Sequence, residues 1–329
     1  MKRHKICKII FAILAVFLCV AFYELIGICI TYKKQPAVSD ATIKETQNIM
    51  SVAGRENTER AVIIEKNSQA LLERVRLIQN AKDEIILSTF AFKSDESGKL
   101  ILGALHDAAD RGVHVRILVD GMESWIDMEG NPYFYGLSSH ENVEIKLYNK
   151  ANPLKPWKTM GRMHDKYLIA DGKIYILGGR NTYNYFLGDF PGHKNFDRDV
   201  LVVCDEPQKD NSVNQLWDYF ETIWEQEDCR YFHNSKKLAD RQSVKKAVLE
   251  LQEGYQQYFE VNKEKICDTD YADETFETEK IILLSNPIHT QAKEPVVWYQ
   301  LGELMKNAKE RVKIHTPYII CNDMMYNTW

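Results

Sequence analysis

The segment MHDKYLIADGKIYILGGRN, residues 163–181, carries the most informative pattern in the chain. Two short runs rich in strand formers, YLIA and IYIL, flank the dipeptide Asp171-Gly172, which favours a tight hairpin turn. His164 and Lys166 are two positions apart beside the first run, so we expect both side chains on one face of the strand. The segment therefore predicts a β-hairpin that brings polar groups together at one end.

The residues around this hairpin alternate between helical and strand patterns. Apolar residues recur at helical spacing in residues 71–78 and 100–109. Runs of strand formers occur at residues 84–92, 113–120 and 143–148. Such alternation indicates an α/β fold with a largely buried mixed sheet flanked by helices.

The polar residues of the hairpin form a set that suits a phosphate ester. An imidazole can attack phosphorus or transfer a proton, and His164 supplies one. Lys166 and Asn181 can hold the non-bridging oxygens as negative charge builds. Gly178 and Gly179 let the backbone turn tightly and let a ligand approach it. The competing interpretation is a hairpin with a hydrogen-bonded histidine. It does not account for the pattern of six positions that these five residues form with Asp171.

This spacing resembles the H-x-K-x4-D-x6-G-[GS]-x-N motif of the phospholipase D superfamily, in its cardiolipin synthase-like branch. The resemblance implies that His164 is a nucleophile that forms a phosphohistidine, and that Lys166 and Asn181 bind the phosphate. It implies that Asp171 supports the catalytic site, and it implies neither a metal nor a cofactor. In this family two such motifs meet at one active site, and the second histidine protonates the leaving group.

Two flanking segments contain further site candidates. Residues 149–162 form a basic loop in which Arg162 is the best candidate for phosphate steering, although a solvated loop would have the same composition. After the motif, the segment Phe196-Asp197-Arg198-Asp199 resembles an Arg-Asp segment of the family whose acid helps to orient the site. Asp199 therefore either supports His164 or forms a salt bridge at the start of a strand.

The N-terminal region predicts a membrane anchor. Residues 9–30 are apolar apart from Glu24 and Gly27, and 22 residues are long enough to cross a bilayer. A cleaved signal peptide is the competing interpretation, but no small-residue cleavage site follows. Four basic residues precede the span and two follow it, which favours a cytoplasmic N-terminus and a catalytic domain on the other side.

The charge balance bears on the substrate. Residues 1–34 hold six Lys or Arg and one Glu, so the other 295 residues hold 36 basic and 46 acidic residues, a net charge of −10. Broad nucleic-acid binding depends on neutralising phosphates with basic side chains. We therefore expect no nucleic-acid partner.

A weak internal repeat suggests two halves. Residues 77–90, LIQNAKDEIILSTF, resemble residues 304–317, LMKNAKERVKIHTP, at an offset of 227 positions. Applied to His164, this offset puts a second motif histidine near position 391, so the second half is expected to be truncated at Trp329. The expected domains are 1–8 (cytoplasmic N-terminus), 9–30 (transmembrane anchor), 31–60 (linker), 61–205 (first phospholipase D-like domain), 206–279 (helical connector) and 280–329 (incomplete start of the second).

Together these observations predict a membrane-anchored phosphodiesterase or phosphatidyltransferase that acts on phospholipid through a phosphohistidine on His164. One alternative is a phosphodiesterase that acts on nucleic acid. The other is a catalytically inactive anchored half-domain. A homodimer that joins two copies of His164 would be another way to complete the site.

Overall fold

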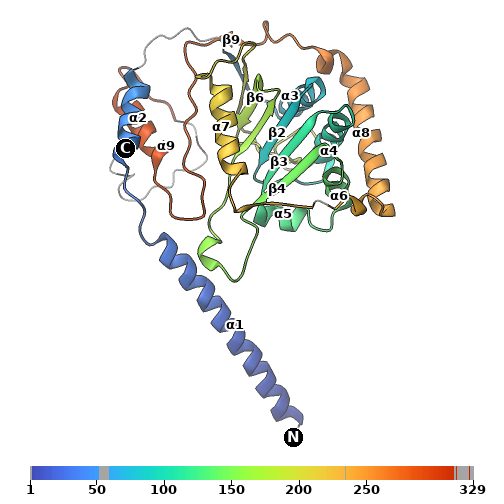
Figure 1. Ribbon diagram of the computed structural model, residues 1–329, viewed down its shortest axis with the longest axis vertical. Coiled ribbons are helices and arrows are strands. Elements are labelled where there is room, and N and C mark those ends of the chain that lie inside the picture. Colours follow the sequence, from blue (N-terminus) through green and yellow to red (C-terminus); the bar gives the residue numbers. More distant parts are fainter. Residues whose placement is uncertain (1, 52–58, 234, 315, 317–325, 327–329) are drawn as a thin grey trace. The chain divides into compact units, whose positions relative to one another are not determined.

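The computed structural model describes residues 2–51, 59–233, 235–314, 316 and 326 (Figure 1). The chain divides into two compact units, which are considered separately. The larger comprises Glu56–Ala151 and Arg162–Ile282, and the smaller comprises Met1–Arg55, Asn152–Gly161 and Leu283–Trp329.

A mixed β-sheet forms the centre of the larger unit. In its described residues the strand order is β8-β4-β3-β2-β5-β6-β7-β1-β9, with β2, β3 and β4 parallel and the other neighbours antiparallel. The strands are β1 (Arg60–Ile64), β2 (Glu84–Thr89), β3 (His114–Asp120), β4 (Val143–Tyr148), β5 (Lys166–Ala170), β6 (Ile174–Gly178), β7 (Asp199–Val203), β8 (Cys229–Tyr231) and β9 (Phe276–Glu277). The predicted α/β fold with a mixed sheet is confirmed.

Helices cover both faces of this sheet. They are α3 (Asn67–Asn80), α4 (Glu96–Asp110), α5 (Gly121–Asp127), α6 (Pro132–Ser138), α7 (Ser212–Trp224) and α8 (Gln242–Cys267). Alternate strand residues such as Ile85 and Leu87 join one core with residues of α3, α4, α6 and α8. Helix α7 covers the opposite face, where Arg116 of β3 lies against the rings of Phe220 and Trp224. Burial on both faces explains why the central strands are almost continuously apolar.

The β5–β6 hairpin has the expected turn. Asp171 and Gly172 both adopt positive φ, 52° and 61°, which is the backbone conformation of a type I′ turn. Lys173 N donates to Ala170 O over 3.0 Å and closes this turn. The hairpin therefore runs in the middle of the sheet, with its turn at one end of the strands and residues 163–166 at the other.

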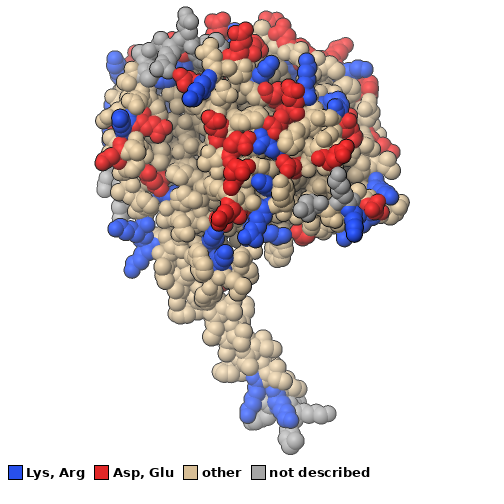
Figure 2. All heavy atoms as spheres, viewed as in Figure 1, with Lys and Arg blue, Asp and Glu red and all other residues tan. Residues whose placement is uncertain are grey.

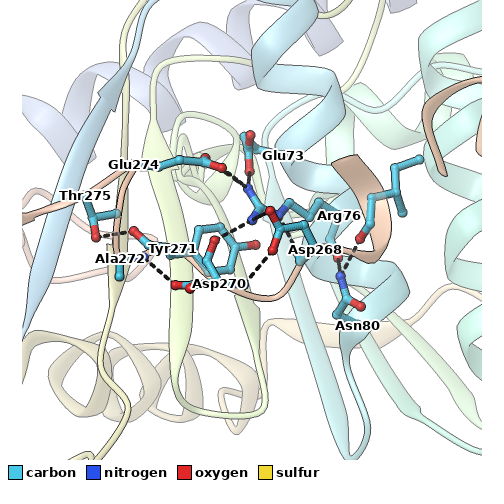
Figure 3. A network of polar contacts seen from close by, with 10 residues as sticks. Glu73, Arg76, Asn80, Asp268, Asp270, Tyr271, Ala272, Glu274 and Thr275 are labelled. Carbon is cyan, nitrogen blue, oxygen red and sulfur yellow. Dashed lines mark hydrogen bonds and ion pairs between the residues drawn. The ribbon is translucent and has the colours of Figure 1, made fainter. Parts of the chain in front are cut away.

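The segment after α8 is held on α3 by one buried arginine (Figure 3). Arg76 donates to Asp268 O over 2.7 Å and to Glu274 over 3.0 Å, and its guanidinium lies 3.9 Å from the ring centroid of Tyr271. Further along, Phe276 of β9 pairs with Ala61 of β1. The region 206–279, expected to be a connector, thus supplies α7, α8 and both edge strands to this unit.

The smaller unit contains α1 (Lys2–Tyr32), α2 (Asp40–Ser51), the short helix η1 (Pro156–Lys158) and α9 (Val296–Lys306). Helix α2 lies in the expected linker, and Ser39 explains its start, because its Oγ accepts from Thr42 N over 3.2 Å. Helix α9 runs into the segment 304–317 that resembles residues 77–90, and the described residues 308–314 contain no strand. The end of that segment lies mostly outside the described residues.

Helix α1 is long and apolar enough to cross a membrane. Figure 2 shows a run of uncharged side chains after the N-terminal lysines of α1, and Glu24 lies further along the helix. On the face shown there, acidic and basic side chains are interspersed over the rest of the chain.

Candidate active site

Four neighbouring strands bring all the motif residues except Asp171 to one edge of the sheet. The register pairs Thr89, the last residue of β2, with Lys166, the first residue of β5. It also pairs Gly178, the last residue of β6, with Asp199, the first residue of β7. Asp120 ends β3, which runs parallel to β2. The carboxyl ends of parallel strands are where α/β folds commonly place their ligands, and the motif lies at that edge.

His164 lies just before β5 and is exposed to solvent. Its ring packs edge-on against Phe90, with 4.5 Å between the ring centroids. Partial removal of water from around the ring lowers the pKa of His164, and the positive charges of Lys166 and Arg162 lower it further, against the opposing charge of Asp120. A neutral, accessible imidazole is the form that can act as a nucleophile.

Lys166 is buried beside His164. Its Nζ donates to the backbone oxygen of His164 over 2.6 Å and lies 5.3 Å from the ring centroid of Phe90. Burial lowers the pKa of Lys166 to about 8, although Asp165, Asp197 and Asp120 oppose the shift. The ammonium form therefore still predominates at pH 7, where it can bind a phosphate oxygen.

Asn181 is fixed by the segment that follows β2. Its Oδ1 accepts a hydrogen bond from Ala91 N over 3.2 Å, and the next residue, Thr182, donates its N–H to Ala91 O over 3.0 Å. Among the residues that the structure describes, Asn181 Nδ2 donates no hydrogen bond. The carboxamide is therefore oriented by its oxygen and keeps its two donors for a ligand.

Arg162 lies at the same edge of the sheet but binds a carboxylate. Its Nε and Nη2 donate to Asp120 over 2.9 and 2.6 Å, and its guanidinium lies 5.1 Å from the ring centroid of Phe90. Asp120 also accepts from the backbone N–H groups of Met163 and Met122, so it orients the chain just before His164 and caps α5. Arg162 was expected to steer phosphate. In the structure its guanidinium binds the carboxylate of Asp120.

Phe90 and Asp120 are site residues that the motif spacing does not indicate. Phe90 contacts His164, Arg162 and Lys166, and Asp120 binds Arg162. Both stand at the carboxyl ends of the parallel strands β2 and β3, and that position is the signal that could have identified them.

Asp171 lies at the other end of the hairpin. Its carboxylate accepts backbone hydrogen bonds from Lys82, Asp83 and Glu84 over 2.8–3.0 Å. Strand β5 separates Asp171 from Lys166, about 16 Å at 3.3 Å per residue. The structure thus brings His164, Lys166 and Asn181 together and places Asp171 where it holds the turn between α3 and β2.

Carboxylates occupy the space beside the two motif glycines. A Cβ on Gly178 would lie 2.0 Å from Asp199 Oδ1, and one on Gly179 would lie 2.0 Å from Asp197 Oδ2. Asp199 is buried and pairs with Arg74 over 2.9 Å and with Arg180 over 3.3 Å. No contact joins Asp199 to His164 among the described residues. The glycines here make room for acidic side chains of the same domain.

In the described part of the chain, no group of three His, Cys, Asp or Glu side chains is arranged to hold a metal ion. The groups assembled at this edge are a neutral imidazole, an ammonium and a free amide donor. They can attack and bind a phosphodiester.

Comparison with known proteins agrees with this chemistry. Residues 75–224 match the family described as "Cardiolipin synthase, PLD-like domain". The chain is 29% identical to cardiolipin synthase C of Escherichia coli K12 over 154 residues, which cover 43% of this chain and 31% of that protein. It is 27% identical over 292 residues to an uncharacterized protein of Helicobacter pylori 26695, covering 80% of this chain and 55% of that protein. The chain thus spans about a third to a half of the length of these relatives.

The structure is also similar to that of the phosphatidylserine synthase of Haemophilus influenzae Rd KW20. The TM-score is 0.45 at 14% identity, over 67% of this chain and 48% of that one. The mixed sheet and the motif at its edge define a phospholipase D-like domain. Residues 75–224 match the phospholipase D-like family, and the chain is similar to the cardiolipin synthases. Members of the superfamily are generally phosphodiesterases or phosphatidyltransferases.

Proposed function

We propose that the protein is a membrane-anchored phospholipase D-like enzyme that transfers or hydrolyses the phosphatidyl group of a glycerophospholipid. The observation that carries this proposal is the exposed His164 with a lowered pKa, next to the ammonium of Lys166. Helix α1 supports a lipid substrate, because an apolar helix of this length would hold the domain beside a bilayer.

The first chemical step is attack by the imidazole of His164 on phosphorus. A bond forms between a ring nitrogen and phosphorus, the bond from phosphorus to the leaving alcohol oxygen breaks, and that oxygen takes up a proton. Lys166 and Asn181 bind the non-bridging oxygens while negative charge builds on them. In the second step an alcohol or water attacks the phosphohistidine and restores the free imidazole.

The proton for the leaving group needs a second acid. No second imidazole contacts His164 among the described residues, and Lys166 donates to a backbone oxygen. We assign this role to a second histidine motif, on a following half of the protein or on a second copy of the chain. The excess of basic residues before the apolar span, four against two after it, supports a catalytic domain on the non-cytoplasmic side of the membrane.

The test is to trap the phosphoenzyme. The protein in lipid vesicles is incubated with a glycerophospholipid labelled in its phosphate and quenched in alkali, where phosphohistidine persists. The peptide that contains His164 is then analysed by mass spectrometry. We expect labelling of this peptide, none in His164→Ala, and unchanged labelling in His114→Ala, a matched surface histidine on β3.

A parallel reaction uses single-stranded DNA labelled in its phosphates. Labelling from DNA and not from lipid would replace the lipid proposal with a nucleic-acid substrate. Absence of label from both substrates would indicate an inactive anchored domain. Label from lipid in the His164→Ala variant would show that another residue is the nucleophile.

A further inference from the structure

Residues 152–161 form a loop that exposes large apolar side chains immediately before the motif. Leu154 is 78% exposed, Met160 is 56% exposed and Trp157 is 38% exposed. Two lysines, Lys155 and Lys158, alternate with them. Soluble surfaces rarely gather apolar groups in this way unless the surface binds a partner or a membrane.

This loop packs against α1, the helix that could span a membrane, and both belong to the smaller unit. The short helix η1 lies beside α1 (Figure 1). The hydroxyl of Tyr23 donates a hydrogen bond to Leu154 O over 3.2 Å. A Cβ on Gly27 would lie 2.5 Å from Pro156 Cγ, so the close approach of the two segments requires glycine at this position.

A hydrocarbon core laid along α1 from Lys8 would end at the level of this contact. A hydrocarbon core is about 30 Å thick, which corresponds to about 20 helical residues. If the core begins at Lys8, the last lysine before the apolar run, it ends near residue 28. Gly27 lies at that boundary, and Tyr23 lies about 6 Å inside it, at 1.5 Å per residue. The loop therefore meets α1 where hydrocarbon gives way to headgroups.

We propose that residues 152–161 are a membrane-docking loop that enters the surface of the bilayer crossed by α1. The aliphatic side chain of Leu154 goes deepest, and Trp157 takes the interfacial position that tryptophan favours. Lys155 extends its ammonium toward the lipid phosphates while its methylene chain stays among apolar groups. The composition of the loop thus fits both layers of the interface that it meets.

Docking of the loop has a consequence for the reaction. His164 is four positions after Met160, so the extended chain between them spans at most about 14 Å. A loop fixed in the interface keeps the nucleophile within that distance of the lipid phosphates. The docking of the loop rests on the membrane anchoring by α1 that the proposed function includes, but not on the phosphohistidine chemistry. Only the statement about lipid phosphates rests on that chemistry as well.

Fluorescence of the full chain in vesicles tests the docking directly. Vesicles of phosphatidylcholine and phosphatidylglycerol are prepared with and without bromine on the acyl chains, because bromine quenches nearby tryptophan. The emission of Trp157 is obtained as the difference between the wild type and Trp157→Phe. We expect this difference to be smaller in brominated vesicles than in unbrominated ones.

The matched control is Trp217→Phe. Trp217 lies next to Gly172, at the hairpin turn and at the opposite end of β5 from the motif. Its difference emission is expected to be equal in both kinds of vesicle. In a Leu154→Asp, Met160→Asp double variant, quenching of Trp157 is expected to fall.

Equal Trp157 emission in both kinds of vesicle would overturn the docking proposal and would indicate that the loop is covered by protein or by water. This readout requires no catalysis. Quenching of Trp157 without phosphohistidine would support the docking loop and contradict the proposed function. Phosphohistidine without quenching of Trp157 would contradict the docking loop and support the proposed function.

Discussion

The two ends of strand β5 use the same motif in different ways. At the Lys166 end, the exposed imidazole of His164 and the buried ammonium of Lys166 both lie near the ring of Phe90. Asn181 Nδ2 has no partner there among the described residues. At the Asp171 end, one carboxylate is saturated by three backbone N–H groups. Polar groups that are held but incompletely paired are available for a ligand, whereas a saturated group stabilises the chain around it.

A shared motif therefore does not imply a shared role. Asp171 is as fixed in the pattern as His164, yet its hydrogen bonds join the hairpin to the start of β2. Geometry separates residues that perform chemistry from residues that hold them in place. The following substitutions test that separation, beginning with the largest expected effect.

Replacement of His164 by alanine is expected to lower turnover by about 10⁴-fold or more, because it removes the nucleophile. The unfolding midpoint should not change, since the side chain is exposed. Phosphodiester turnover and chemical denaturation of the same preparation measure both effects. A comparable loss in His114→Ala would contradict the assignment.

Asn181 offers a cleaner separation of structure from chemistry. Asn181→Asp keeps an acceptor for Ala91 N but removes the amide donors, so we expect near-normal stability and a fall in kcat of about 100- to 1,000-fold. Asn181→Ala removes both functions and should also lose about 1 kcal/mol of stability. Steady-state kinetics and urea unfolding distinguish the two variants. Equal stability of both would mean that the bond to Ala91 contributes little.

Asp171→Ala is expected to lower the free energy of unfolding by about 2 kcal/mol, because it leaves three backbone donors without their acceptor. The kcat should remain near that of the wild type under conditions where the protein is folded. Lys173→Ala, in the same turn and exposed, is the matched control and should change stability by less than about 0.5 kcal/mol. A large loss of kcat with normal stability would show that Asp171 acts in catalysis.

The pH dependence of turnover is the smallest effect, about tenfold per pH unit on each side of the optimum. His164 must be neutral, and its pKa is lowered, so activity should fall only as the pH drops through a value below 6.5. Lys166 must be charged, so activity should also fall above its pKa of about 8. In Lys166→Arg the alkaline decline should disappear, because arginine does not lose its proton in this range. An unchanged alkaline limb would assign that decline to another group.

Local patterns were sufficient to predict much of this structure. The runs around Asp171-Gly172 predicted the hairpin, and the alternation of apolar segments predicted the α/β sheet. His164, Lys166 and Asn181 are close in sequence, so their spacing alone indicated that they converge. Each of these inferences depends on residues within one or two neighbouring elements.

Long-range pairings could not be obtained in the same way. Nothing in the segment around residue 90 indicates that Phe90 will lie against His164, because that contact follows from the register of β2 on β5. Arg162 binds Asp120, 42 positions away, whereas the sequence alone left phosphate steering and a solvated loop as equal alternatives. Helices α5 and α6 have seven residues each, too few for an apolar period to stand out.

The pairing of β1 with β7 also imposes an order in time. Arg60 lies opposite Val203, 143 positions later, so β1 leaves the ribosome about 7 to 29 s before its partner at 5–20 residues per second. Helix α1 is complete before β1 has even begun, whereas β5 and β6 follow each other at once. Strand β1 can therefore pair with β7 only after the β5–β6 hairpin has been synthesised, when α1 has long been complete.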